Sequence, residues 1–244
     1  MKKPHLDIGC SAYSNRYWKG IFYPEILPKS DWFAFYSEHF NTYEINSSFY
    51  RFPTLKSLQS WYQKSPDDFT FAVKAPKIIT HLKQFTDCHQ ETDEFYGNCH
   101  KGLGKKLGCI LFQLPPSVAF TPYRLALVLS YMNADFCNVI EFRHETWWRP
   151  EVYEALAEKN VTFCNVSYPN LPNTLAQTNN IGYFRMHGVP KIFQSGYPEE
   201  DLRQLKEAVA LTQWDKAYVY FNNTASQAGI LDALTLKKLK SRYR

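Results

Sequence analysis

Short apolar runs that alternate with helical patterns are the feature that most restricts how this chain can fold. Eight runs of five to seven residues, rich in β-branched and aromatic side chains, indicate buried strands at residues 6–10, 42–46, 69–74, 107–113, 137–142, 161–166, 181–186 and 216–221. Helices are expected after most of them, at 32–40, 54–64, 84–105, 121–133, 151–159 and 198–211, with a last helix near the C-terminus. Strands that alternate with helices predict a parallel sheet.

Eight β/α repeats in 244 residues match a TIM barrel in number and length. A dinucleotide-binding sheet is disfavoured because no G-x-G-x-x-G motif follows the first strand. We therefore predict an α/β protein with one domain over residues 1–244, a TIM (β/α)8-type barrel. A long first loop at 11–24 and an inserted polar helical region near 84–105 elaborate it. We expect a loop at 47–53.

Smaller features bear on packing and on the compartment. The 45% hydrophobic and 17% aromatic content supports a sizeable core. Most of the six cysteines lie in or beside apolar runs, which predicts reduced thiols. No signal-like apolar run follows Met1-Lys-Lys-Pro, and no stretch has membrane-spanning length, so we expect a cytoplasmic protein that does not enter a membrane. Ser30 is a candidate cap for the helix at 32–40.

The charge balance gives only weak support for a nucleic-acid partner. The net charge is +5, without the dense Lys/Arg stripe of most nucleic-acid binders. The basic cluster at 237–244 is better explained as a helix end, where cations complement the dipole.

Metal binding is not predicted. Cys88-His89 and Cys99-His100 are adjacent pairs, and adjacent residues seldom ligate one ion. The chain has no C-x-x-C or H-x-H pattern, and no Asp at a strand end. Cys10 is a possible nucleophile, but a buried thiol is the preferred interpretation, because no base lies near it in the sequence. No cofactor is indicated.

The stretch Val139–Trp148 changes from a buried strand to a charged segment. Because strand side chains return to the same face every second residue, Glu141 and Arg143 point the same way. Charges at the mouth of an apolar strand are costly unless they are paired or bind something. The two side chains therefore form either a structural ion pair or part of a ligand site.

Polar residues at the C-terminal ends of other strands repeat this pattern. They are Glu44 and Asn46, Lys74, Gln113, Arg185 and His187, and Asn222, with His81 and His144 in the segments that follow strands. Active sites of TIM barrels lie at this end of the strands, so we predict a polar cavity there. Each residue also has a structural explanation: Glu44 could neutralise Lys74, Gln113 could hold loop backbone, His81 could cap a helix, and His144 could face solvent.

The residue types favour an anionic ligand. Lys74, Arg143 and Arg185 suit a carboxylate or phosphate. Tyr13 and Trp147 could stack on a sugar or base, or could anchor their loops. The candidates for acid–base chemistry are Glu44, Glu141, His187 and His81. The two carboxylates Glu44 and Glu141 also make hydrolysis of a glycosidic bond a candidate reaction, although the distance between them cannot be read from the sequence.

Seven motifs in one order resemble a known family. They are Ile8-Gly-Cys-Ser11, Trp18-Lys-Gly-Ile-Phe-Tyr-Pro24, Glu44-Ile-Asn-Ser-Ser-Phe-Tyr50, Phe71-Ala-Val-Lys-Ala-Pro76 with Ile79-Thr-His81, Gln113-Leu-Pro-Pro116, Glu141-Phe-Arg-His144 with Trp147, and Phe221-Asn-Asn223. Over nearly its whole length the chain resembles the YecE-like family of domains of unknown function, number seventy-two. The resemblance implies a TIM-barrel-like fold with a polar cavity at the strand C-termini, and no activity.

Two departures from the family pattern lie near the predicted cavity. Cys10-Ser-Ala-Tyr13 stands where the family usually reads Thr-Ser-Gly-Trp, and Thr224 stands where Asp or His usually follows the two asparagines.

Two functions remain open from the sequence. The first is an enzyme with hydrolase-like or isomerase-like acid–base chemistry on a small anionic substrate, phosphorylated or sugar-containing. In it Glu141 or Glu44 would be the general base and His187 or His81 an acid. The alternative is a non-catalytic binding or sensing barrel for a nucleotide or a nucleic-acid end.

Overall fold

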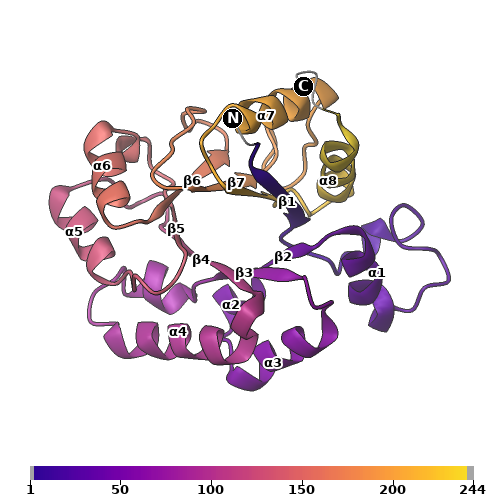
Figure 1. Cartoon of the computed structure of the whole chain (residues 1–244), viewed down its shortest axis with the longest axis horizontal. Helices are drawn as coiled ribbons and strands as arrows, with labels where there is room; N and C mark the ends of the chain where they lie inside the picture. The colour runs from indigo at the N-terminus through magenta and orange to yellow at the C-terminus, as the bar shows by residue number, and fades with distance from the viewer. Residues whose placement is uncertain (1–2, 241–244) are drawn as a thin grey trace. The chain divides into compact units, whose positions relative to one another are not determined.

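The eight predicted strands are all present in the computed structural model, which describes residues 3–240 (Figure 1). They are β1 His5–Cys10, β2 Thr42–Ile45, β3 Thr70–Lys74, β4 Leu107–Gln113, β5 Asn138–Glu141, β6 Thr162–Ser167, β7 Ile181–Met186 and β8 Lys216–Phe221. Every boundary lies within one residue of its prediction. The apolar, β-branched runs fix these boundaries because their side chains are almost all buried.

The strands form one sheet in the order β1-β8-β7-β6-β5-β4-β3-β2. With the alternating helices, this order confirms the predicted α/β fold class of TIM-like (β/α)8 proteins. The register pairs Cys10 of β1 with Phe221 of β8, and Phe221 with Met186 of β7. In the same way, Gln113 of β4 pairs with Glu141 of β5. Parallel strands in register deliver their last residues to the same edge.

Eight α-helices lie within residues 3–240: α1 Trp32–His39, α2 Ser47–Tyr50, α3 Leu55–Lys64, α4 His89–Leu103, α5 Pro122–Ser130, α6 Pro150–Glu158, α7 Glu199–Ala210 and α8 Ala228–Lys238. The Thr54 and Thr121 hydroxyls cap α3 and α5 by accepting backbone N–H bonds. Lys237 and Lys238 occupy the last turn of α8, as expected for a basic helix end. Residues 241–244 of the basic cluster lie outside the described residues.

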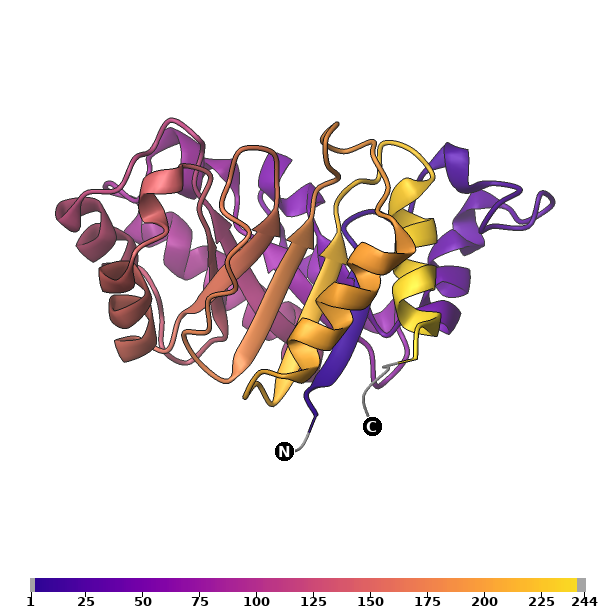
Figure 2. The ribbon, with the colours of Figure 1, turned by 90° about the horizontal axis from the view of Figure 1, so that it is seen from above.

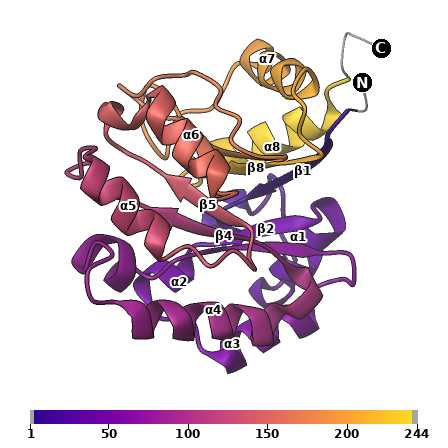
Figure 3. The same cartoon turned by 60° about the vertical axis from the view of Figure 1, so that its left-hand side comes forward.

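The described residues fall into two compact units. The first unit comprises residues 3–44, 165–173 and 180–240, and the second comprises 45–164 and 174–179. In the first unit, α7 and α8 lie side by side, and α8 packs against β1 and β8 (Figure 2). In the second unit, α3 and α4 lie side by side, and α4 packs against β4 (Figure 3).

Three local predictions were wrong. Residues 47–50, expected in a loop, form the short helix α2, where the buried Ser48 hydroxyl bonds to backbone carbonyls. Ser30 does not cap α1, because it lies in a 3-10 turn and donates its hydroxyl proton to Asp31. The polar helix begins only at His89, since residues 84, 85 and 87 have positive φ angles that a right-handed helix excludes.

Within residues 3–240, the helices are all too short or too polar to cross a bilayer.

Two glycines differ in the space that surrounds them. A Cβ at Gly9 of β1 would lie 2.4 Å from the Thr42 carbonyl oxygen, whereas a Cβ at Gly97 of α4 would meet nothing within 4 Å. We expect Gly9→Ala to lower the free energy of unfolding by about 1–3 kcal/mol through overpacking. Gly97→Ala should raise it by about 0.5–1 kcal/mol by removing backbone entropy from the unfolded chain.

Urea unfolding followed by circular dichroism measures both effects. Equal stability of the two variants would contradict the close approach of β1 to the start of β2.

Candidate functional site

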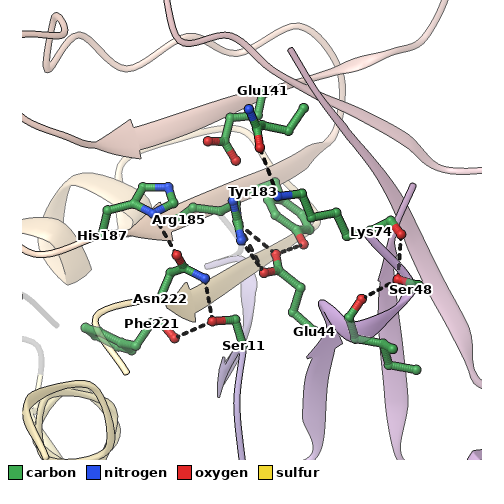
Figure 4. A network of polar contacts seen from close by, with 12 residues as sticks. Ser11, Glu44, Ser48, Lys74, Glu141, Tyr183, Arg185, His187, Phe221 and Asn222 are labelled. Atoms are coloured by element: carbon green, nitrogen blue, oxygen red, sulfur yellow. Dashed lines mark hydrogen bonds and ion pairs between the residues drawn. The ribbon is translucent and has the colours of Figure 1, made fainter. Parts of the chain in front are cut away.

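A buried ion pair anchors the polar residues of the first unit. Glu44 of β2 and Arg185 of β7 have no more than 1% of their side chains exposed. Arg185 donates from Nη2 at 2.7 Å to one carboxylate oxygen, and from Nε at 3.1 and 3.0 Å to both oxygens. The Tyr183 hydroxyl donates to the Glu44 carboxylate at 2.6 Å (Figure 4).

This geometry corrects the predicted roles of Glu44. Its two oxygens are engaged by a bidentate guanidinium and a phenol, so the carboxylate offers no open edge to a substrate proton. The interpretation in which Glu44 neutralises Lys74 is replaced by the pairing with Arg185. Glu44 holds Arg185 and Tyr183 in place, and is therefore unsuited to act as a general base.

A second row in the first unit consists of the residues that directly follow β7, β8 and β1. His187 Nδ1 lies 3.0 Å from Asn222 Oδ1, and Asn222 Nδ2 donates to Ser11 Oγ at 2.5 Å. The Ser11 hydroxyl donates in turn to the Phe221 carbonyl at 3.3 Å (Figure 4). The strand register brings the row together, because each member stands one residue after a register-paired strand end.

In the second unit, Lys74 is the centre of a polar group at the end of β3. Its side chain is 9% exposed, and Nζ donates to Gln113 Oε1 at 2.9 Å. Nζ also lies 4.2 Å from the centre of the Phe49 ring, a cation–π contact. The Ser48 hydroxyl donates to the Lys74 carbonyl at 2.6 Å. Gln113 Nε2 donates to the Leu114 carbonyl at 2.7 Å, so Gln113 both holds loop backbone and binds Lys74.

His81 lies in a short π-helical turn, Ile78–Leu82, that follows β3. Its ring packs edge-on against Phe49, with centroids 4.8 Å apart, and Nδ1 lies 2.9 Å from Thr80 Oγ1. Burial, together with the nearby cations Lys74 and Arg143, lowers the pKa of His81 to about 4, against a smaller opposing effect of Glu141. At neutral pH the His81 imidazole is therefore uncharged and has an acceptor nitrogen.

Glu141 and Arg143 form the ion pair suggested by their spacing. Arg143 Nε contacts Glu141 Oε1, with side chains 9% and 0% exposed. The pair therefore forms as the spacing suggested, and Arg143 is close enough to lower the pKa of His81. The second unit thus places Lys74, Arg143 and Glu141 near the half-buried imidazole of His81.

Trp147 is a correction among the predicted ligand-binding residues. It is fully buried, stacks on Phe142 with centroids 4.0 Å apart, and donates from Nε1 to the Val118 carbonyl at 2.8 Å. A ring without exposed surface cannot stack on a ligand, so Trp147 anchors its loop. His144 accepts a hydrogen bond at Nδ1 from the Thr146 backbone N–H at 3.3 Å, which makes it the cap of the turn at 145–147.

Other predicted residues occupy different settings. Tyr13 is half-buried, packs edge-on against Phe33 and Tyr43, and has a pKa that burial raises. Asn46, expected on the strand face with Glu44, follows the end of β2 and is the first residue before α2. Cys10 is fully buried, and desolvation raises the pKa of its thiol, as expected for a core thiol.

Sequence reasoning missed Tyr183, Ser11 and Phe49. Tyr183 stands two residues before Arg185 on the same strand face, and this spacing could have revealed it. Ser11 and Phe49 lie within two of the family motifs, but their residue types do not single them out, because a serine after a strand and a phenylalanine in a short helix are common. Within the part of the chain that the structure describes, no group of three or more His, Cys, Asp or Glu side chains could hold a metal ion.

Comparison with known sequences gives a family match along the chain. A sequence profile described as "Protein of unknown function DUF72" matches residues 7–243. The UPF0759 protein YunF of Bacillus subtilis is 27% identical over 126 residues, which are 49% of this chain and 45% of YunF. The UPF0759 protein YecE of Escherichia coli K12 is 29% identical over 112 residues, 45% of this chain and 40% of YecE. The aligned stretch therefore covers less than half of these relatives.

Comparison with solved structures gives the same family. A DUF72 family protein of Thermotoga maritima is similar with a TM-score of 0.86 and 28% identity, covering 96% of this chain and 98% of the other. A DUF72 family protein of Enterococcus faecalis has a TM-score of 0.81 at 17% identity, covering 96% and 94%. At this lower identity the likeness concerns the fold alone.

Glu44→Gln tests the anchoring role of the buried ion pair. The amide removes the negative charge and turns a donor toward Arg185 and Tyr183, so we expect a loss of about 3–5 kcal/mol in the free energy of unfolding. Glu199→Gln is the matched control. Glu199 pairs with Arg203 at 2.6 Å but is 63% exposed, and its loss should be below about 1 kcal/mol. Similar losses in urea titrations of the two variants would contradict the anchoring role.

Proposed function

The chain belongs to the family of proteins of unknown function DUF72, whose description assigns no activity, and we propose a function from the chain's own residues. We propose that the protein is an enzyme that performs acid–base chemistry on a small anionic substrate, phosphorylated or sugar-containing. Reactions of the hydrolase or isomerase type fit this chemistry. The observation that carries the proposal is that the Phe49 ring contacts both the Lys74 ammonium, 4.2 Å from its centre, and the His81 ring, 4.8 Å away, while Lys74 and Arg143 lower the pKa of His81.

Lys74 and Arg143 are suited to hold the anionic group. Both lie in a partly desolvated setting, where a charge-assisted hydrogen bond to phosphate or carboxylate is stronger than in water. Glu141, fully buried and paired with Arg143, orients the guanidinium. With one carboxylate, two cations and a neutral imidazole, the group has a net charge of about +1 at pH 7.

Substrate binding would itself activate His81. The two cations now disfavour a proton on the imidazole. An anion bound between them offsets that repulsion and raises the pKa of His81 toward neutral pH, where a general base works best. In an isomerase-type reaction His81 would take a proton from one substrate carbon and return it to a neighbouring carbon. In a hydrolase-type reaction it would take a proton from the attacking water and pass it to the leaving group. The pKa rise depends on the anion, so uncharged compounds would be poor substrates.

A non-catalytic role in binding a nucleotide or a nucleic-acid end is the second candidate. One observation favours it: Tyr50 is 76% exposed and packs edge-on against Phe49, which contacts both Lys74 and His81. An exposed aromatic face beside cations suits a base attached to a phosphate.

Titration of His81 by NMR tests the anion site. In wild-type protein the His81 pKa should be near 4, and inorganic phosphate should raise it by at least about one unit, as a nearby opposite charge does. Lys74→Met should raise the pKa without phosphate and weaken the response to phosphate. Lys77→Met is the matched control, because Lys77 is exposed and is not among the causes of the shift. A His81 titration that saturating phosphate leaves unchanged would overturn the site.

Turnover separates the enzyme from the binding protein. A panel of small phosphorylated and sugar compounds is screened with wild-type protein and His81→Gln. Turnover that His81→Gln abolishes, while phosphate binding persists, supports the enzyme. Nucleotide binding without turnover in the wild type, and with equal affinity in His81→Gln, supports the second candidate.

A further inference from the structure

The row of residues after β7, β8 and β1 fixes the position of one proton. The Ser11 hydroxyl has a single proton, which it donates to the Phe221 carbonyl at 3.3 Å. Ser11 Oγ therefore accepts from Asn222, and Asn222 presents Nδ2 to it at 2.5 Å. The other end of the amide, Oδ1, then faces His187 Nδ1 at 3.0 Å. An amide oxygen only accepts, so His187 Nδ1 must carry a hydrogen.

We propose that Asn222 and Ser11 are positioning residues that keep a proton on Nδ1 of His187, so that Nε2 is the nitrogen that gains and releases a proton. The fixed proton on Nδ1 does not depend on the proposed acid–base function, which is built on His81, because it follows from the direction of the hydrogen bonds alone.

The surroundings of the row keep it rigid. His187 is fully buried, and its ring packs edge-on against Tyr168 and Phe193, with centroids 5.5 and 6.1 Å away. The His187 backbone N–H bonds to the Ser167 carbonyl at 3.1 Å, and the Asn222 N–H bonds to the Met186 carbonyl at 2.8 Å. Backbone pairing therefore sets the separation of the two side chains, and the aromatic rings restrict rotation of the imidazole.

The chain contains an opposite case that serves as an internal reference. His144 Nδ1 lies 3.3 Å from the Thr146 backbone nitrogen and 2.9 Å from Thr146 Oγ1, whose hydroxyl proton can also be donated to it. A backbone N–H can only donate, so His144 Nδ1 accepts, and the proton of the neutral ring is on Nε2. The two histidines should thus show opposite tautomers in one spectrum.

Long-range ¹⁵N–¹H NMR of the full chain, with side-chain assignments for both rings, tests the proposal. We expect a protonated Nδ1 at His187 throughout the titration, and an unprotonated Nδ1 at neutral His144. Asn222→Leu should remove the preference at His187, whereas Asn222→Asp, which keeps an acceptor, should retain it. His144 should not change in either variant. A neutral wild-type His187 with its proton on Nε2 would overturn the proposal.

The outcome is independent of the proposed function. An NMR result as expected with no turnover on any compound would establish the fixed proton at His187 and refute the acid–base function proposed for His81.

A separate observation concerns two thiols of the second unit. Cys109 of β4 and Cys137, directly before β5, have their Sγ atoms 3.1 Å apart. The register pairs Ile110 with Asn138, so the two cysteines stand opposite each other one residue earlier, and the Ile110 N–H bonds to the Cys137 carbonyl at 2.9 Å. Residues that face each other on paired strands lie within the Cα separation that a disulfide spans. Cys109 is 1% exposed, while Cys137 is half-buried and can be reached from solvent.

We infer that Cys137 and Cys109 form an oxidation site for small disulfides. The Cys137 thiolate attacks the disulfide of a compound such as oxidised glutathione and releases one glutathione thiol. Cys109 then displaces the second glutathione from Cys137 and closes the protein disulfide. In total, two protein thiols are oxidised, one small disulfide is reduced to two thiols, and the two protons pass to the leaving thiols.

Oxidised glutathione followed by alkylation and mass spectrometry tests this site on the folded chain. We expect a loss of two hydrogens and a Cys109–Cys137 crosslink in the wild type, with Cys99 and Cys164 alkylated only after unfolding. Cys109→Ser should stop at a glutathione adduct on Cys137, and Cys137→Ser should not react. A wild-type protein that accumulates the adduct without the crosslink, or that does not react, would overturn the inference.

Discussion

The side chains of Glu44 and Arg185 are removed from water, and neither charge could stay buried without the other. The carboxylate is supplied by β2 and the guanidinium by β7, so the pair depends on both strands being in place. Tyr183 completes the carboxylate's hydrogen bonds from the same face of β7. Removing either charge would leave an uncompensated ion in the interior, and the polar groups at the strand ends of this unit share that dependence on complete pairing.

The strands could be predicted from the sequence because their information is local. A run such as 107–113 is mostly apolar and is bounded by turn residues, and it became β4 without change. The ion pair of Glu141 and Arg143 could also be predicted, because side chains two residues apart at a strand end point to the same face. The pairing of Glu44 with Arg185 was not, because it depends on strands that are distant in the chain. One sequence does not show which of the strands that are far apart in the chain have ends that face each other.

Side-chain burial was the other limit. Trp147 and Tyr13 follow strands or lie in long loops, where an aromatic ring can serve a ligand or the core equally well. Packing decides between these roles, and it placed Trp147 against Phe142. The short helix α2 was missed because Ser47-Ser-Phe-Tyr50 has little helix propensity, and hydrogen bonds from Ser48 to neighbouring carbonyls compensate. The lowered pKa of His81 likewise comes from neighbours that the sequence does not place beside it.

Each member of the row at His187, Asn222 and Ser11 stands one residue beyond a strand end. The segments that continue from these residues can therefore change in length over evolutionary time, provided that the change begins after the first residue and leaves Phe193 packed against His187. A deletion of one residue inside β7 or β8 has the opposite effect, because it turns every later side chain of that strand to the other face. Insertions and deletions should thus be tolerated beyond the first residue that follows each of these strands, and not within the strands themselves.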